Sequence, residues 1–193
     1  MAFRPSSPEI HVWAGHLLFF IGAYEDAAKA YSNINNVNKN FEVLLYKAKC
    51  YLTCKDVLNT LANLKFMLEI RPDPQVQFDH QMLDCLRECS DEAMTDYEGV
   101  RNKMKGVKRA TDGKFGLIFN DFDYQFYKGV MYFYDKKYAE ASKNFKRGMD
   151  IIEKQMNSPN PPLDEQFYYD YKKLSFSNRA YNYFEVVYNL AIS

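Results

Sequence analysis

Four cysteines are the residues of this 193-residue chain that could bind a metal together. They form two pairs, Cys50 with Cys54 and Cys85 with Cys89. The spacing within each pair places both thiols on one face of a helix, so four thiolates could surround a zinc ion. Structural zinc sites, however, usually carry paired cysteines in a turn. Both pairs lie in strongly helical stretches, and we therefore expect buried free thiols in a reducing compartment and no cofactor.

Other reactive side chains lack the neighbours that catalysis requires. No cysteine or carboxylate stands at metal-ligand or catalytic-triad spacing from the three histidines, His11, His16 and His80. The sequence contains no glycine-rich phosphate loop, no HExxH and no GxSxG. Residues 111–116, TDGKFG, lack the first glycine of a phosphate loop and the Ser or Thr after Lys114. We predict that the chain is not an enzyme, and that NDFD at 120–123 is a helix cap.

Six basic side chains lie close together in the second half of the chain, opposed only by Asp112. They are Arg101, Lys103, Lys105, Lys108, Arg109 and Lys114. We interpret this stretch as a basic loop, which either contacts phosphates or an acidic protein segment, or is simply solvated. Basic and acidic residues number 25 each, so no net charge draws the chain to nucleic acid. No RNP or KH signature accompanies the loop, and nucleic acid is a minor reading.

Three segments of the chain align with one another: residues 8–34, 41–72 and 122–152. Each reads as two amphipathic helices joined by a short polar turn. A small residue recurs in the first helix of each segment, namely Gly15, Ala48 and Gly129. A bulky residue recurs in the second helix, namely Tyr31, Leu64 and Phe145. Small residues allow helices to approach closely, and large ones fill the gaps between them.

This pattern resembles the tetratricopeptide-repeat (TPR) family, whose unit is a helix–turn–helix of 34 residues. The resemblance implies an all-α fold, a right-handed TPR-like α-solenoid. We expect a single domain with units at about 8–40, 41–74 and 122–156 and a partial unit at 184–193. The insertion at 75–121 is predicted to be an extra helix followed by a loop. Because the last stretch is apolar and lacks a polar capping helix, we expect the N-terminal part of a longer solenoid.

In TPR proteins one face of each first helix lines a concave groove that binds partners. Carried over to this sequence, the partner-binding groove would consist of Val12, His16, Phe19, Phe20, Leu45, Lys49, Phe126, Val130, Phe133 and Tyr134. So many aromatic rings suit an apolar helix or an extended peptide, unless the chain's own insertion fills the groove. Val12 and His16 stand where chaperone-binding members carry Lys and Asn, so a chaperone tail is not the expected partner.

The family resemblance favours a non-catalytic protein–protein interaction scaffold. We expect a structural subunit of a large assembly, such as a cilium, an axoneme or a transport complex, because degenerate TPR units with long insertions resemble those of ciliary proteins. The alternatives are a soluble peptide-binding adaptor and an RNA-binding accessory protein. The expected partners are other proteins, with no small-molecule substrate. No run approaches the roughly 18 apolar residues of a membrane span, and no secretory signal is present, so a cytoplasmic or ciliary location is expected.

Overall fold

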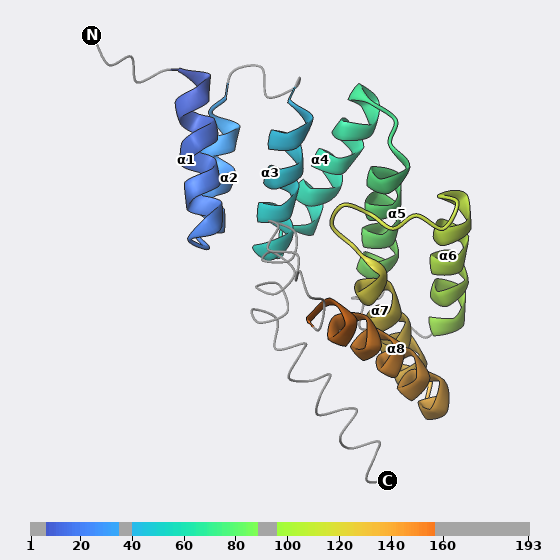
Figure 1. The fold of residues 1–193 in the computed structure, drawn as a ribbon. Coiled ribbons are helices and arrows are strands. Elements are labelled where there is room, and N and C mark those ends of the chain that lie inside the picture. Colours follow the sequence, from blue (N-terminus) through green and yellow to red (C-terminus); the bar gives the residue numbers. More distant parts are fainter. Residues whose placement is uncertain (1–6, 35–39, 89–95, 157–193) are drawn as a thin grey trace. The chain divides into compact units, whose positions relative to one another are not determined.

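The computed structural model describes residues 7–34, 40–88 and 96–156. All regular structure in these ranges is helical, which confirms the all-α prediction (Figure 1). No helix among these residues is long and apolar enough to cross a membrane. In chain order the described helices are α1 (Pro8–Phe20), α2 (Tyr24–Ser32), α3 (Phe41–Thr53), α4 (Val57–Ile70), α5 (Pro74–Glu88), α6 (Tyr97–Ala110), α7 (Asp121–Tyr134) and α8 (Tyr138–Met156).

The chain forms two compact units. The first compact unit comprises Met1–Ser90 and Val107–Ile118, and the second comprises Asp91–Gly106 and Phe119–Ser193. In the first, each of the helices α1 to α5 packs against the next, and α1 also touches α3. In the second, α7 packs against α8. Packing in sequence order is compatible with an α-solenoid, while its right-handed course and its continuity as one domain stay predictions.

Polar residues that satisfy the first free backbone amides fix where the helices begin. The side-chain oxygens of Asn40, Asp56 and Asn120 each accept a hydrogen bond from a backbone amide in the first turn, at 3.3, 3.1 and 3.1 Å. Asp123 returns the bond at the start of α7, where its carboxylate accepts from the amide of Asn120 at 3.0 Å. This reciprocal capping box confirms the cap predicted for residues 120–123.

The three hairpins α1–α2, α3–α4 and α7–α8 turn in the same way. Each first helix is followed by one residue in the left-handed region, with φ of 86° at Gly22, 63° at Lys55 and 57° at Lys136. The next amide then reaches back to a carbonyl of the preceding helix, as in a Schellman motif. These bonds run from Ala23 to Leu18 at 2.8 Å, from Asp56 to Tyr51 at 2.9 Å and from Lys137 to Tyr132 at 2.9 Å.

The small and bulky residues of the repeat meet across the hairpins as predicted. A Cβ atom added to Gly15 would collide with the ring of Tyr31, which is fully buried. One added to Gly129 would lie 2.6 Å from Cε1 of Phe145. In the second hairpin Ala48 stands at this place and is also fully buried. The first and third segments therefore share one packing scheme, in which the second helix lies directly against the glycine of the first, and the burial of Ala48 agrees with the same scheme in the second segment.

The prediction of a single extra helix in the insertion was wrong, because the described part of the insertion contains two helices, α5 and α6. The stretch from Arg101 to Arg109 lies on α6, so it is a helix and not the basic loop that we expected. After α6 the described part of the insertion forms a short loop, with a turn at Asp112 and Gly113, both of which have positive φ. The fully buried carboxylate of Asp79 on α5 holds this loop by accepting from the amide of Ile118 at 3.0 Å.

Candidate protein-binding surface

The predicted groove residues of α1 fall into two groups. Phe19 is buried, with its ring packed edge-on against Tyr24 and Tyr46 at centroid distances of 5.4 and 5.0 Å. Val12, His16 and Phe20 are half-buried. The imidazole of His16 shares a hydrogen bond of 2.9 Å with the hydroxyl of Tyr31. Val12 and Phe20 lie on the same side of the helix as His16, so they are the α1 groove residues with surface left for a partner.

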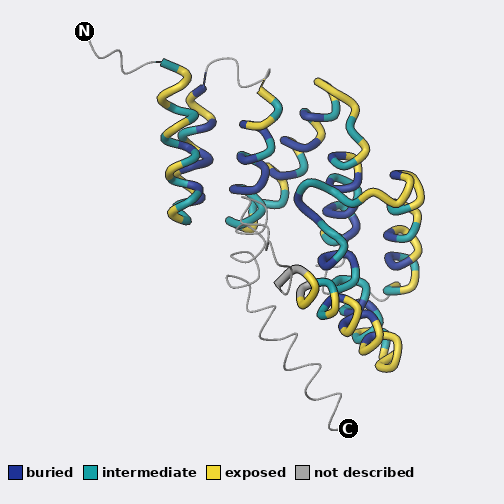
Figure 2. Tube along the Cα trace, in the orientation of Figure 1, coloured by how far each residue is buried: buried dark blue, intermediate teal, exposed yellow. Residues whose placement is uncertain are grey.

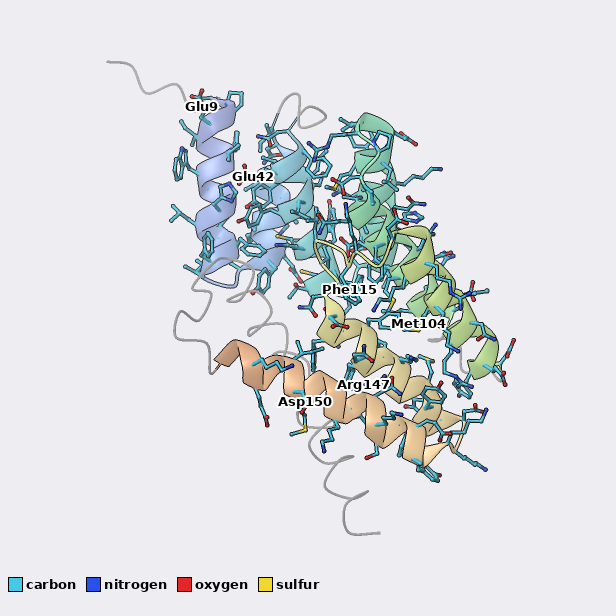
Figure 3. All side chains as sticks on the ribbon, turned by 45° about the vertical axis from the view of Figure 1, so that its right-hand side comes forward. Glu9, Glu42, Met104, Phe115, Arg147 and Asp150 are labelled. Atoms are coloured by element: carbon cyan, nitrogen blue, oxygen red, sulfur yellow. The ribbon has the colours of Figure 1, made fainter. Side chains whose placement is uncertain are left out.

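The two groove residues of α3 also differ in burial. Leu45 is half-buried, whereas Lys49 is buried with its ammonium group 5.5 Å from the ring centroid of Tyr46. A cation over an aromatic face is attracted by the negative charge density of the ring, so Lys49 belongs to the helix packing. Glu9 and Glu42 stand at the same register in α1 and α3 and are both exposed (Figure 3). α1 and α3, which contact each other, therefore both carry an exposed glutamate at the first position of the predicted groove face.

On α7 the predicted residues mostly support the neighbouring helix. Phe126, Val130 and Phe133 pack against the buried pair Ala141 and Phe145 of α8. Tyr134 is different, since 59% of its surface is exposed. Its ring stacks on that of Tyr97, with centroids 5.7 Å apart and planes 15° from parallel. Replacing the phenylalanines would therefore disturb the α7–α8 hairpin as well as any binding surface. That α1, α3 and α7 line one common groove stays a prediction.

The basic residues do not form the loop that we predicted, and Arg101 is not available to a partner. Arg101 is only 3% exposed, and its guanidinium lies over the ring of Tyr132 at 4.4 Å. It donates to a carboxylate oxygen of Asp135 at 2.6 Å and to the backbone carbonyl of Met131 at 3.3 Å. Buried charges in proteins are normally paired in this way, so Arg101 attaches α6 to α7.

The other basic residues vary in exposure. Lys103, Arg109 and Lys114 are exposed, whereas Lys105 and Lys108 are half-buried. Among them Lys108 has a defined role, because its ammonium group lies 4.4 Å from the ring centroid of Phe115, in the loop after α6 (Figure 3). The basic character predicted for this stretch is thus carried mainly by one face of α6 and by Lys114.

The thiols stand apart from any ligand cluster in the part of the chain that the structure describes. Cys50 and Cys54 are free, and the described residues form no group of three or more potential metal ligands. Burial, reinforced by the neighbouring Cys54, raises the pKa of Cys50 to about 12. Burial is also the main reason that the pKa of Cys54 is raised. Cys89 lies outside the described residues, so the second predicted pair is incomplete here.

One surface was not foreseen from the sequence. Ile10, Trp13, Leu17 and the capping residue Ile21 are all exposed on α1, which carries many exposed positions along its length (Figure 2). We call these four residues the α1 stripe. The signal was present, because most residues of α1 are apolar and they fall on more than one side of the helix, which is more than one buried face requires. Exposed apolar rows of this kind are typical of interaction surfaces.

Comparisons with protein-family models, with curated proteins and with solved structures gave no match. Fold alone does not specify function, so the surface residues of this chain and their packing are the basis for assigning one.

Proposed function

We propose that this chain is a non-catalytic, TPR-type scaffold that binds other proteins. One observation supports this most: three helical hairpins share the same left-handed turn, and in two of them a glycine of the first helix lies directly against a buried ring of the second. Repeated hairpins that stack in sequence order present the same face of successive helices side by side. Such a surface suits an extended peptide or a helix of another protein.

The proposed partner surface of the first compact unit centres on three half-buried apolar residues, Val12, Phe20 and Leu45. Their neighbours in the same rows, Phe19 and Lys49, are buried and hold the helices together. A rigid support beneath partly exposed apolar side chains is what a binding surface needs, because little conformational entropy is lost when a partner docks.

A structural subunit of a large cytoplasmic assembly, such as a ciliary or transport complex, is the class that we favour. The exposed apolar residues on α1 are consistent with a chain that is surrounded by other subunits. A soluble peptide adaptor is the alternative. The two differ in where the native chain is found: a subunit migrates almost entirely with a large complex, whereas an adaptor is largely free.

The test uses the intact chain and the partner identified by crosslinking in its native complex. We expect Phe20→Ser and Leu45→Ser together to weaken binding of the purified partner by at least about tenfold, because apolar anchors dominate most interfaces. The matched control is Leu58→Ser on α4, whose side chain is 70% exposed and lies outside the predicted rows. Equal losses in both proteins, or no loss in either, would reject this surface as the binding site.

A further inference from the structure

The α1 stripe forms one continuous apolar line along the first helix. Trp13, Leu17 and Ile21 are 69%, 66% and 73% exposed, and Ile10 extends the line towards the start of the helix. The residues are spaced by three or four positions, so they project from one side of α1. The opposite side of the same helix carries Gly15 and Phe19, which are buried.

The equivalent face of α3 is covered by a helix pair. Measured from Gly15 in α1 and Ala48 in α3, the residues of α3 that correspond to Ile10, Trp13 and Leu17 are Val43, Tyr46 and Cys50. All three are buried. The ring of Tyr46 is enclosed by rings of the preceding hairpin, with centroids 4.7 Å from His16, 5.0 Å from Phe19 and 6.3 Å from Tyr31.

The equivalent face of α7 is covered as well. Measured from Gly129, the corresponding residues are Tyr124, Tyr127 and Met131, of which Tyr124 and Met131 are buried and Tyr127 is half-buried. Here α6 provides a contact, since Arg101 donates to the carbonyl of Met131 and to Asp135. The face of α1 that the described residues leave open is thus the face over which the other two hairpins receive a helix.

We propose that the α1 stripe binds the α1 stripe of a second copy of this chain, with the two helices antiparallel. A two-fold interface must be complementary to itself. The stripe meets this condition, because antiparallel pairing places Ile10 opposite Ile21 and Trp13 opposite Leu17. All four side chains are uncharged, and the acidic Glu9 is the sole charged residue among the residues of α1. No like charges therefore oppose one another across the centre of the pair.

The exposed area agrees with a dimer that forms reversibly. The exposed fractions of the stripe leave on the order of 500 Å² of apolar surface per copy, so pairing would bury about 1,000 Å² in total. That value lies at the lower limit of specific interfaces, and we expect a dissociation constant in the micromolar range. Self-association of this kind is separate from the proposed scaffold role, and it can be measured without a partner protein.

Trp13 makes the proposal directly measurable, because it is the chain's one tryptophan. We expect the tryptophan fluorescence of the intact chain to shift to shorter wavelengths as the protein concentration rises from submicromolar to hundreds of micromolar. The mass measured by analytical ultracentrifugation should double over the same range. Leu17→Glu keeps the reporter but places a charge inside the pair, and should weaken the dimer by at least about tenfold.

The matched control is Leu58→Glu on α4, which is as exposed as Leu17 and should leave the dimer unchanged. Circular dichroism of both variants establishes that they fold. A monomeric mass with red emission at every concentration would overturn the proposal. So would a dimer that both variants weaken equally, since a different surface would then be responsible. A blue shift seen only with added lipid vesicles, or only with another protein, would likewise show that the stripe binds something other than a second copy.

Discussion

Replacing Gly129 by alanine adds one methyl group at the point where α7 touches α8. The new Cβ would lie 2.6 and 2.7 Å from Cε1 and Cδ1 of Phe145, about 1 Å closer than carbon atoms prefer. Phe145 is buried and cannot move aside freely. Overpacking of this kind costs about 1–3 kcal/mol, while alanine gains up to about 1 kcal/mol in helix propensity over glycine. We expect a net destabilisation of roughly 1 kcal/mol, and a larger one for Gly129→Leu.

The matched control is Gly106→Ala on α6. A Cβ at Gly106 meets nothing within 4 Å, so only the gain in helix propensity remains. This variant should therefore be stabilised by about 0.5–1 kcal/mol. Thermal and urea unfolding followed by circular dichroism measures both changes, and 1 kcal/mol corresponds to a shift in melting temperature of a few degrees.

A double-mutant cycle separates the collision from any other effect of the methyl group. Phe145→Leu replaces the ring that Gly129 touches with a smaller side chain. Gly129→Ala should therefore be less destabilising in that background than in the wild type. Strict additivity, or a stabilisation by Gly129→Ala equal to that of Gly106→Ala, would refute the close contact and with it the shared register of the hairpins.

Three further perturbations test individual contacts. Arg101→Ala should lower stability by about 1–3 kcal/mol in urea unfolding, because the buried side chain's hydrogen bonds to Asp135 and to the carbonyl of Met131 and its packing over the ring of Tyr132 are lost. Hydrogen bonds from Lys137 and Arg101 hold the pKa of Asp135 below its ordinary value. Their contribution to the stability of the fold is therefore complete above about pH 4 and is lost as the pH falls further. This loss of stability at low pH should be smaller in Arg101→Ala. Asp79→Asn should speed amide hydrogen exchange at Ile118, since one acceptor becomes a donor. In the native protein, mass spectrometry should show that iodoacetamide alkylates Cys54 before Cys50, because Cys50 is buried and has a pKa of about 12.

The register of the hairpins could be predicted because it depends on residues that are close in the chain. Gly15 and Tyr31 are separated by one turn and two short helical stretches, so the pattern of small and bulky residues nearly defines their contact. The cap at Asn120 is more local still, since its donor and acceptor lie in one helical turn. Contacts of this range leave a clear trace in the sequence.

The burial of Arg101 could not be predicted in the same way. Its partners, Met131 and Asp135, lie on α7, far along the chain, and the surrounding lysines favoured a solvated loop. The apolar residues Val100, Met104 and Val107 do recur at helical spacing, and they were the available sign that this stretch is a helix. Lys49 was misleading for a related reason, since the ring of Tyr46 stabilises its charge in the interior.

The exposure of the α1 stripe could not be predicted for another reason, because equivalent positions of successive repeats are covered by different neighbours. The sequence shows that Trp13, like Tyr46, is large and apolar, and both would be assigned to a buried face. Tyr46 is buried because the α1–α2 hairpin precedes it, whereas Trp13 has no described helix in that place. Burial in a repeat is thus a property of the neighbour as much as of the residue. Apolar surface that the described residues leave open on α1 therefore favours association, and the fluorescence of Trp13 reports whether a second copy supplies the missing helix.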